Sequence, residues 1–521
     1  MSVAEFLPSP NLDGNSVAKG ASQTVEGMFS KAYGAQLTWS QLPIKERIAR
    51  LKPLRSLLVK NRKRIADSIL VPSRQDYRET IASEILPLAD CVQWLGRRAR
   101  KILEPRYSHR RFTPFWLGAV RSTVFRVPHG IVLIIGAGNY PLFLMGVQVL
   151  HALVAGNAVA IKPAPGAEQT SQILVELLIE SGIPQELLVV LDSDIHAGEQ
   201  AIEAGVDKVV LTGSSRTGRS VLKMLADSLT PATMELSGCD AVYVLPGADL
   251  IRVCDLLLFG MRLNGGATCM APRRVFVPRK LSEVFHRLLS ERLRSDYAKN
   301  WRTAVPASVH KRLWDAVEAA VRQGANIFSD SPRGSLPSVD RIEQAEHAQS
   351  STVRIGPVVL TDVLPTMAIC SMDLFAPLLL IVPVEDWSDA LLADSKCPYA
   401  LTASVYGPLE DAIRLAKYIS AGTITINDTI VPTADPQIPF GGRGESGYGV
   451  TRGDEGLLEM TTPKVVSIRK GKWLPHAQVP QPVDEELLDG LLQLAHSGSW
   501  IDRFRGLQQT LQAAFKSRRQ N

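Results

Sequence analysis

The sequence has no paired-cysteine pattern. None of its six cysteines forms a CxxC pair, and their spacing does not resemble a secreted disulfide framework. Residues 1–14 have neither the basic start nor the apolar run of a signal peptide. These absences argue against zinc or thioredoxin-like sites, so we expect no metal centre, and they favour a reducing, cytoplasmic location. The cysteines are Cys91, Cys239, Cys254, Cys269, Cys370 and Cys397.

Concentrated charge of one sign is also missing. The 521 residues hold 58 Lys and Arg against 52 Asp and Glu, so a net charge of +6 is spread thinly. Nucleic-acid binding needs a concentrated basic face, so we expect no nucleic-acid partner. The length predicts two or three domains, and 45% hydrophobic with 21% charged residues is ordinary globular usage.

Between residues 127 and 161 the chain has no Asp, Glu, Lys or Arg. This length would allow a transmembrane helix, but glycine, asparagine and proline interrupt the segment. A better interpretation is a buried strand over Ile131–Ile135, a tight turn, a helix from Pro141 and a second strand over Ala158–Lys162. Such a βαβ unit predicts a parallel sheet buried on both faces and no transmembrane segment.

Alternating patterns continue beyond this unit. They predict a doubly wound nucleotide-binding domain, in which ligands bind at the carboxyl ends of the strands. Lys162 and the turn at Gly213-Ser214 lie at such ends, and the turn precedes a helix whose N-terminus would suit a pyrophosphate. The GxGxxG fingerprint is absent, so the residues alone leave the cofactor open. The further predicted elements are a helix over Gln169–Ser181, a strand over Leu187–Leu191, a helix over Asp194–Ala204 and a strand over Val206–Leu211.

A carboxylate and a thiol stand 34 positions apart (269 − 235), at Glu235 and Cys269. Cys269 ends a run of small residues, Asn264-Gly-Gly-Ala-Thr-Cys, which lets backbone and substrate approach the sulfur. A thiolate is a strong nucleophile, and a nearby base activates it or a later water. The alternative for either residue is structural, because a cysteine is often a small buried hydrophobe.

Several motifs resemble those of the aldehyde dehydrogenase superfamily. Glu235 and Cys269 match its Leu-Glu-Leu-Gly-Gly-like and Asn-x-Gly-Gln-x-Cys-like segments at about the family's separation. At least six motifs, in the family's order, cover about residues 35–472. The other matches are Gly136-Ala-Gly-Asn139-Tyr-Pro, Lys162-Pro-Ala-Pro165, Leu211-Thr-Gly-Ser214, Asp373-Leu-Phe-Ala-Pro377, Gly407, Asn427, and Pro439-Phe-Gly-Gly442 with Ser446-Gly447.

The resemblance implies an α/β fold with a Rossmann-type cofactor domain, an α/β catalytic domain and a β-rich oligomerisation arm. It also implies a homodimer or homotetramer, because the family's arm joins subunits. The residues beyond the resemblance are expected to form a helical extension. The expected boundaries are 1–105 and 128–236 for the NAD(P)-binding domain, 106–127 and 449–472 for the arm, 237–448 for the catalytic domain and 473–521 for the extension.

The chemistry that the resemblance implies is NAD(P)-dependent oxidation of a small-molecule aldehyde to a carboxylic acid. Cys269 would attack the aldehyde, and the amide of Asn139 with the backbone N–H of Cys269 would hold the oxyanion. Glu235 would then act as the general base on water. The expected contacts of the cofactor, NAD or NADP, are Lys162, Pro165, Gly213, Ser214, Leu236, Asp373 and Phe375.

Two of these expected contacts depart from the family's pattern. Asp373 stands where the family's Glu bonds the nicotinamide ribose, and Pro165 stands where a Glu bonds the adenine ribose. Loss of the second carboxylate removes a like charge that would oppose a 2′-phosphate. We therefore expect the protein to accept NADP.

Two other functions stay open. An acylating relative would pass the thioester to coenzyme A, but such relatives commonly lack the glutamate that stands here as Glu235. The altered cofactor contacts and the extra tail also fit a catalytically silent binding or scaffold subunit. Amphipathic helices are expected over Glu485–Ala495 and Ile501–Phe515, either packed within the protein's own assembly or against a partner or membrane surface.

Overall fold

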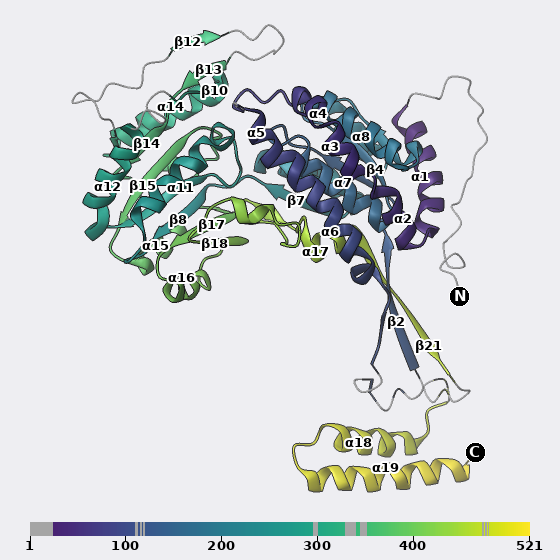
Figure 1. The fold of residues 1–521 in the computed structure, drawn as a ribbon. Helices are drawn as coiled ribbons and strands as arrows, with labels where there is room; N and C mark the ends of the chain where they lie inside the picture. The colour runs from purple at the N-terminus through teal and green to yellow at the C-terminus, as the bar shows by residue number, and fades with distance from the viewer. Residues whose placement is uncertain are drawn as a thin grey trace. The chain divides into compact units, whose positions relative to one another are not determined.

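The computed structural model divides into two compact units, Met1–Glu104 with Arg126–Thr462, and Pro105–Phe125 with Pro463–Asn521 (Figure 1). Residues 1–14, on which the expectation about a signal peptide depends, lie outside the described part. The structure describes residues 24–520 except 75, 110–112, 115–116, 118–119, 295–300, 329–339, 344–351, 471–473, 475–476 and 478.

A six-stranded sheet organises the first half of the large unit. Five of its strands are parallel, and the short β20 joins the edge antiparallel. In spatial order the strands are β20 (Gly447–Tyr448), β7 (Ala232–Leu236), β6 (Lys208–Gly213), β3 (Ile131–Ile135), β4 (Ala158–Lys162) and β5 (Leu188–Val190). The crossover helices are α7 (Phe143–Ala155), α8 (Glu168–Ser181), α9 (Ile195–Glu203) and α10 (Ser215–Leu225).

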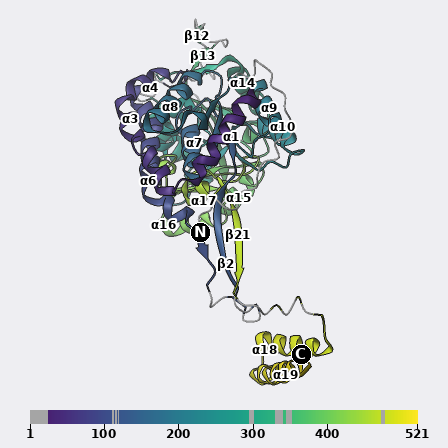
Figure 2. The same cartoon turned by 90° about the vertical axis from the view of Figure 1, so that its right-hand side faces the viewer.

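The strand order makes β3 the start of the sheet, with later strands added on both sides. The chain runs outward from β3 through β4 to β5, and then returns to add β6 and β7 on the other side of β3. Right-handed crossovers then place α7 and α8 on one face and α9 and α10 on the other, and α8 and α10 lie on opposite sides in Figure 2. The direction of winding therefore reverses between β3 and β6, where an open sheet has a crevice for ligands.

The expected strands Ile131–Ile135 and Ala158–Lys162 are confirmed residue for residue as β3 and β4. Every residue of both is buried, as expected for a parallel sheet with helices on both faces. The helix expected from Pro141 begins at Phe143 instead, because Pro141 and Leu142 form a turn before it. Strand–turn–helix–strand is therefore the correct interpretation of this uncharged segment.

The helices that precede this sheet pack around it. The helix α6 contacts α7, and α1 contacts β3, β4 and β5. Prolines at positions 43 and 53 stand before α2 and α3 and divide the N-terminal helical region. The elements are α1 (Val25–Gln41), α2 (Ile44–Leu51), α3 (Leu54–Lys60), α4 (Arg62–Ser68), α5 (Tyr77–Thr80), a π-helical turn η2 (Ile81–Ile85) and α6 (Leu86–Leu103).

A seven-stranded sheet organises the second half of the large unit. It is parallel except for β11 at one edge. Its order is β11 (Asn326–Ile327), β14 (Val358–Thr361), β15 (Leu378–Val384), β9 (Pro272–Pro278), β8 (Asp240–Val244), β17 (Thr402–Tyr406) and β18 (Thr423–Ile426). Its main helices are α11 (Leu250–Arg262), α12 (Arg279–Arg294), α14 (Ala307–Arg322), α15 (Trp387–Asp394) and α16 (Leu409–Ala416). The helix α17 (Gly453–Leu458) packs instead against α6 and α7 of the first half.

Smaller β elements complete the large unit. One is a three-stranded antiparallel sheet, and another is a two-stranded ladder. The three-stranded sheet has the order β10 (Thr303–Pro306), β13 (Thr352–Ile355) and β12 (Asp340–Glu343). The two-stranded ladder pairs β16 (Tyr399–Ala400) with β19 (Arg443–Gly444).

The small unit contains a three-stranded antiparallel sheet and a helical hairpin. The sheet has the order β1 (Arg106–Tyr107), β2 (Val120–Pro128) and β21 (Thr461–Arg469), so the two segments expected to form the arm, 106–127 and 449–472, pair with each other. The hairpin consists of α18 (Pro482–His496) and α19 (Trp500–Gln520), which pack closely through Gly490 and Gly506. Among the residues that the structure describes, no helix is long and apolar enough to span a bilayer.

Candidate active site

The carboxylate of Glu235 lies at the carboxyl end of β7. Glu235 is 4% exposed, and its Oε2 accepts a hydrogen bond of 2.9 Å from the hydroxyl of Thr451. Its Oε1 is buried without a hydrogen-bond partner among the described residues. Burial raises the pKa of Glu235, while Arg452 and the bond from Thr451 act in the opposite direction. One carboxylate oxygen is thus held in place, and the other stays available to a ligand or a water.

The segment that carries Cys269 follows α11 in a tight turn. Asn264, Gly265 and Gly266 all have left-handed backbones, with φ of 51°, 59° and 75°. A Cβ on Gly266 would lie 2.5 Å from the carbonyl oxygen of Ala376, so only glycine fits there. The run of small residues in the sequence therefore reflects close backbone packing around the thiol.

The segments that carry Glu235 and Cys269 come into direct contact. A Cβ on Gly238 would stand 2.6 Å from the carbonyl oxygen of Cys269, which shows how closely the two backbones approach. Cys269 is partly exposed. Burial of the thiol raises its pKa, the negative charges of Glu235 and Asp240 raise it further, and Arg452 lowers it. At neutral pH the resting group is therefore the protonated thiol, which needs a base to become a nucleophile.

Asn139 follows β3 and is fixed by three neighbouring groups. The side-chain Nδ2 of Asn139 donates to the backbone carbonyl of Ala267 (3.1 Å). The backbone carbonyl of Asn139 accepts from Asn264 Nδ2 and from Arg74 Nη2 (2.9 Å each). Because a side-chain amide has two hydrogens, one remains for a substrate oxyanion. Ala267 stands two residues before Cys269, so this hydrogen bond brings Asn139 to the same site as the thiol.

A cavity of about 530 Å³ opens at the carboxyl ends of β3, β4, β6 and β7. Its lining includes Asn139, Glu235 and Cys269. It also includes all seven expected cofactor contacts: Lys162, Pro165, Gly213, Ser214, Leu236, Asp373 and Phe375.

The groups around this cavity fit a dinucleotide. Ser214 caps the N-terminus of α10 by accepting from Thr217 N (3.2 Å), so the positive end of the helix dipole faces the ligand site. Lys162 is buried, and burial lowers its pKa while Asp194 and Glu168 raise it. For the carboxylate of Asp373 burial has the opposite effect and raises the pKa, although a hydrogen bond with Ser237 lowers it. The cavity thus offers a helix N-terminus, a cation and a carboxylate to NAD or NADP.

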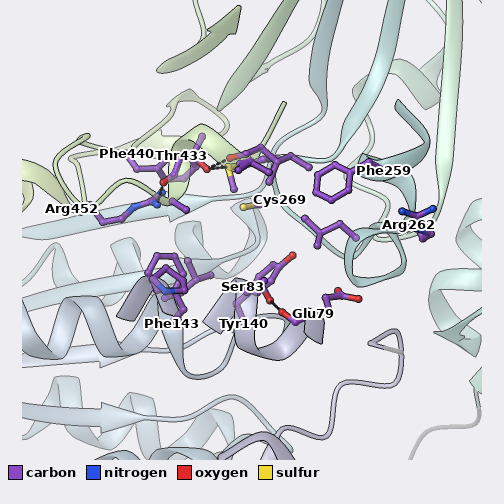
Figure 3. A pocket seen from close by; sticks show the side chains of 18 of the residues that line it. Glu79, Ser83, Tyr140, Phe143, Phe259, Arg262, Cys269, Thr433, Phe440 and Arg452 are labelled. Atoms are coloured by element: carbon purple, nitrogen blue, oxygen red, sulfur yellow. Dashed lines mark hydrogen bonds between the residues drawn. The ribbon is translucent and has the colours of Figure 1, made fainter. Parts of the chain in front are cut away.

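A second cavity, of about 570 Å³, opens on the other side of the thiol. Figure 3 shows Cys269 at its middle, with Arg452 and Phe143 on one side and Phe259 and Arg262 on the other. Glu235, Cys269 and Leu144 line both cavities, so the thiol and the carboxylate stand where the two spaces meet. The larger apolar side chains that line this second cavity are Tyr140, Phe143, Leu144, Phe259, Leu263, Met270, Ile430, Val431 and Phe440.

Several residues of the site were not expected from the sequence. Thr451 bonds the Glu235 carboxylate, Asn264 holds the Asn139 backbone, and Arg452 lines the second cavity. Asn264 belongs to the Cys269 motif, which was a usable signal for it. Thr451 and Arg452 follow Ser446-Gly447 closely in the chain, but no charge pattern distinguishes them from solvated residues. Within the described residues no cluster of metal-ligating side chains is found.

Fold and site together define a dinucleotide-dependent oxidoreductase with a thiol and a carboxylate between its two cavities. A sequence model of the aldehyde dehydrogenase family matches residues 4–466. The chain therefore belongs to the aldehyde dehydrogenase family, whose members use NAD or NADP.

Individual relatives agree with this assignment. The chain is 30% identical over 504 residues to 4,4'-diapolycopene aldehyde oxidase of Methylomonas sp, covering 94% of this chain and 90% of that one. It is 27% identical to a putative succinate-semialdehyde dehydrogenase [NADP(+)] 2 of Mycobacterium bovis, covering 86% and 85%. A solved structure of NADP-dependent glyceraldehyde-3-phosphate dehydrogenase from Bacillus halodurans C-125, complexed with NADP, superposes with a TM-score of 0.74 at 26% identity, covering 85% and 91%.

Proposed function

We propose that this protein oxidises an apolar aldehyde to a carboxylic acid, with Cys269 as the nucleophile and Glu235 as the general base. The observation that carries the proposal is that both residues line both cavities. An aldehyde in the 570 Å³ cavity and a nicotinamide in the 530 Å³ cavity would then meet at the thiol.

The proposed chemistry begins with transfer of the thiol proton of Cys269 to a solvent water. The thiolate of Cys269 bonds to the aldehyde carbon, and the resulting oxyanion of the thiohemiacetal accepts from Asn139 Nδ2 and the backbone N–H of Cys269. NAD or NADP, when bound, accepts the hydride that leaves this carbon. The carbonyl re-forms as a thioester on Cys269. Glu235 then takes a proton from water, which attacks the thioester and releases the carboxylic acid with return of the thiol.

The proposal that NADP is accepted depends on Pro165. This residue lines the cofactor cavity, and Glu168, the nearest following acid, does not. The pKa of Glu168 is lowered: burial opposes this, but hydrogen bonds with Ser193 and backbone groups and the charge of Lys162 outweigh it. Lys162 remains in the cavity as a point charge for a 2′-phosphate. The name of the Mycobacterium relative and the NADP complex of the Bacillus structure also support this proposal.

The aromatic and aliphatic lining of the second cavity supports an apolar substrate. The relative from Methylomonas is named for 4,4'-diapolycopene aldehyde, which agrees with that choice. The intact thiol and carboxylate argue against a silent subunit, and Glu235 argues against acyl transfer to coenzyme A.

The test is NAD(P)H absorbance with the purified protein and a panel of aldehydes of graded polarity, with both cofactors and with and without coenzyme A. We expect turnover that is independent of coenzyme A and highest with apolar aldehydes. Turnover that requires coenzyme A would identify an acylating enzyme. Cofactor binding without turnover on any aldehyde would identify a silent subunit.

We also propose a homodimer or homotetramer that works in the reducing cytoplasm. Val465 and Ile468 of the arm strand β21 are 60% and 53% exposed, which suits a subunit contact. All six cysteines are free. Light scattering of the purified protein measures the subunit number, and truncation at residue 462 should reduce it.

A further inference from the structure

The guanidinium of Arg452 is a buried charge beside the thiol and the carboxylate. The residue is 4% exposed and lines the second cavity. Its guanidinium carbon lies 4.3 Å from the centre of the Phe440 ring and 5.6 Å from that of Phe143 (Figure 3). Its Nη1 donates to the carbonyl of Thr433. Among the residues that the structure describes, Arg452 forms no ion pair with a carboxylate.

The backbone of Arg452 is also in an unfavourable conformation. Its φ of 62° and ψ of 171° fall in a region that is essentially restricted to glycine. The neighbouring Gly453, which has φ 65°, shows that glycine was available to this turn. Arg452 therefore carries two costs, a strained backbone and a buried charge without a direct counter-ion. A glycine at position 452 would avoid both costs.

The charges that face the guanidinium indicate a role for this side chain. Burial lowers the pKa of Arg452, and the negative charges of Glu235, Cys269 and Cys91 raise it. Arg452 in turn lowers the pKa of His151. Burial raises the pKa of Cys91 to about 12 and lowers that of His151 to about 4, so both are neutral at pH 7. Glu235 and Cys269 are left as the groups whose ionisation Arg452 balances. Thr451, the preceding residue, bonds the same carboxylate.

We propose that Arg452 is a positioning residue whose guanidinium is the fixed positive charge that compensates Glu235 and the Cys269 thiolate within the dry site. This inference rests on the proposed function, because it assigns Arg452 a part in the step that generates and uses the nucleophile. Arg452 touches neither the thiol nor the carboxylate directly and acts through the field in a poorly solvated cavity. The backbone strain is then the cost of holding this charge beside the thiol and the carboxylate.

Three variants separate this role from a structural one. Arg452→Met removes the charge and keeps the apolar stem, Arg452→Lys keeps a charge, and Arg452→Gly relieves the backbone. For Arg452→Met we expect a ten- to hundredfold lower kcat, with the acid limb of the pH–rate profile moved upward by about one pH unit, since the carboxylate and the thiol lose a stabilising cation. Arg452→Lys should recover most of the rate and the wild-type profile. Arg452→Gly should lose activity as the methionine variant does, with an unchanged or higher Tm.

A second readout needs neither aldehyde nor cofactor. Iodoacetamide alkylates the Cys269 thiolate, and mass mapping of that peptide, with Cys269→Ala as the blank, gives the rate against pH. The midpoint should move upward by about one pH unit in Arg452→Met and stay in place in Arg452→Lys. This readout still reports on Arg452 if the wild type oxidises no aldehyde, so failure of the proposed function is recognised separately.

Three results would overturn the inference. The first is an alkylation profile that is the same in wild type and Arg452→Met. The second is a large loss of Tm in Arg452→Gly, which would make the side chain structural. The third is an effect confined to KM for aldehydes with an anionic end group, which would make Arg452 a substrate contact.

Discussion

The two cavities that meet at Cys269 are built in different ways. The cofactor cavity collects the carboxyl ends of four parallel strands, and its lining contains backbone turns such as Gly213-Ser214. The second cavity, of about 570 Å³, is the one in which we propose that the aldehyde binds, and we call it the aldehyde cavity. It is lined by side chains from α5, α7, α11 and the loops near residues 430–452. A cavity made by strand ends follows from the topology of the sheet, whereas a cavity made by side chains depends on how distant elements pack.

This difference predicts how each side responds to substitution. Substitutions in the cofactor cavity should alter the kcat/KM of the cofactor and leave the KM of the aldehyde unchanged. Substitutions in the aldehyde cavity should alter the KM of the aldehyde and leave the KM of the cofactor unchanged. Changes at the junction should affect both.

The largest effect is expected at the junction itself. Cys269→Ala should abolish oxidation, with a loss of at least about a thousandfold in kcat, because no other group in the site can form the covalent intermediate. Folding and cofactor binding should persist, as measured by circular dichroism and by quenching of intrinsic fluorescence on addition of NADP. Substantial turnover by the pure, folded variant would refute the assignment of the nucleophile.

Glu235→Gln should slow deacylation more than hydride transfer, by about a hundredfold in steady-state kcat, since water attack needs the base. A pre-steady-state burst of NAD(P)H followed by a slow phase is the expected record. Thr451→Val is the matched control, because it removes one hydrogen bond to the same carboxylate and keeps the base. If single-turnover hydride transfer falls as much as steady-state turnover, the base acts on the thiol instead.

On the cofactor side, Pro165→Glu should shift the preference from NADP towards NAD by about ten- to a hundredfold in the ratio of kcat/KM values. The added carboxylate would repel a 2′-phosphate and could accept hydrogen bonds from a ribose diol, each worth about 1–3 kcal/mol. The aldehyde's KM should stay within about twofold. The interpretation of this position is wrong if wild type prefers NAD a thousandfold or if Pro165→Glu leaves the ratio unchanged.

On the aldehyde side, Phe259→Ala should raise the KM of an apolar aldehyde by roughly tenfold, because it removes apolar surface that lines this cavity and not the other. The KM of the cofactor should not change. Ile195→Ala is the matched control, since Ile195 lines the cofactor cavity alone and should affect the cofactor's KM alone. Equal effects of both variants on both ligands would mean that the two cavities are not separate sites.

The sequence predicted the cofactor side well for a local reason. The strands β3 and β4 are continuous buried runs between glycine and proline turns, so the residues at each end of a run indicate where the strand begins and ends. Five of the seven expected cofactor contacts line one cavity because they lie at the carboxyl ends of strands that share one edge of a sheet, whereas Asp373 and Phe375 come from the segment before β15 of the other sheet. Family resemblance added the roles of Glu235 and Cys269, which no periodic pattern reveals.

Some features depended entirely on tertiary structure. Thr451 bonds the Glu235 carboxylate from more than 200 positions along the chain (451 − 235 = 216), and Arg452 is the next residue. A solvated threonine and arginine would look the same in the sequence. The helical hairpin gives a second case, because amphipathicity predicted α18 and α19 but not which face each would bury. They pack through Gly490 and Gly506, while Trp500, Phe504 and Phe515 are exposed.

The sequence, with its family resemblance, determined the two-domain α/β fold, the strand ends at which we propose that a dinucleotide binds, and the thiol and carboxylate pair. These features follow from local periodicity, turn residues and motifs within short segments. Only the tertiary structure decided that the thiol and the carboxylate line both cavities, that one oxygen of Glu235 has no partner, and that a strained, buried arginine stands beside them. The physical reason is that burial and electrostatic field are set by the groups that surround a residue in space, and those groups come from distant parts of the chain.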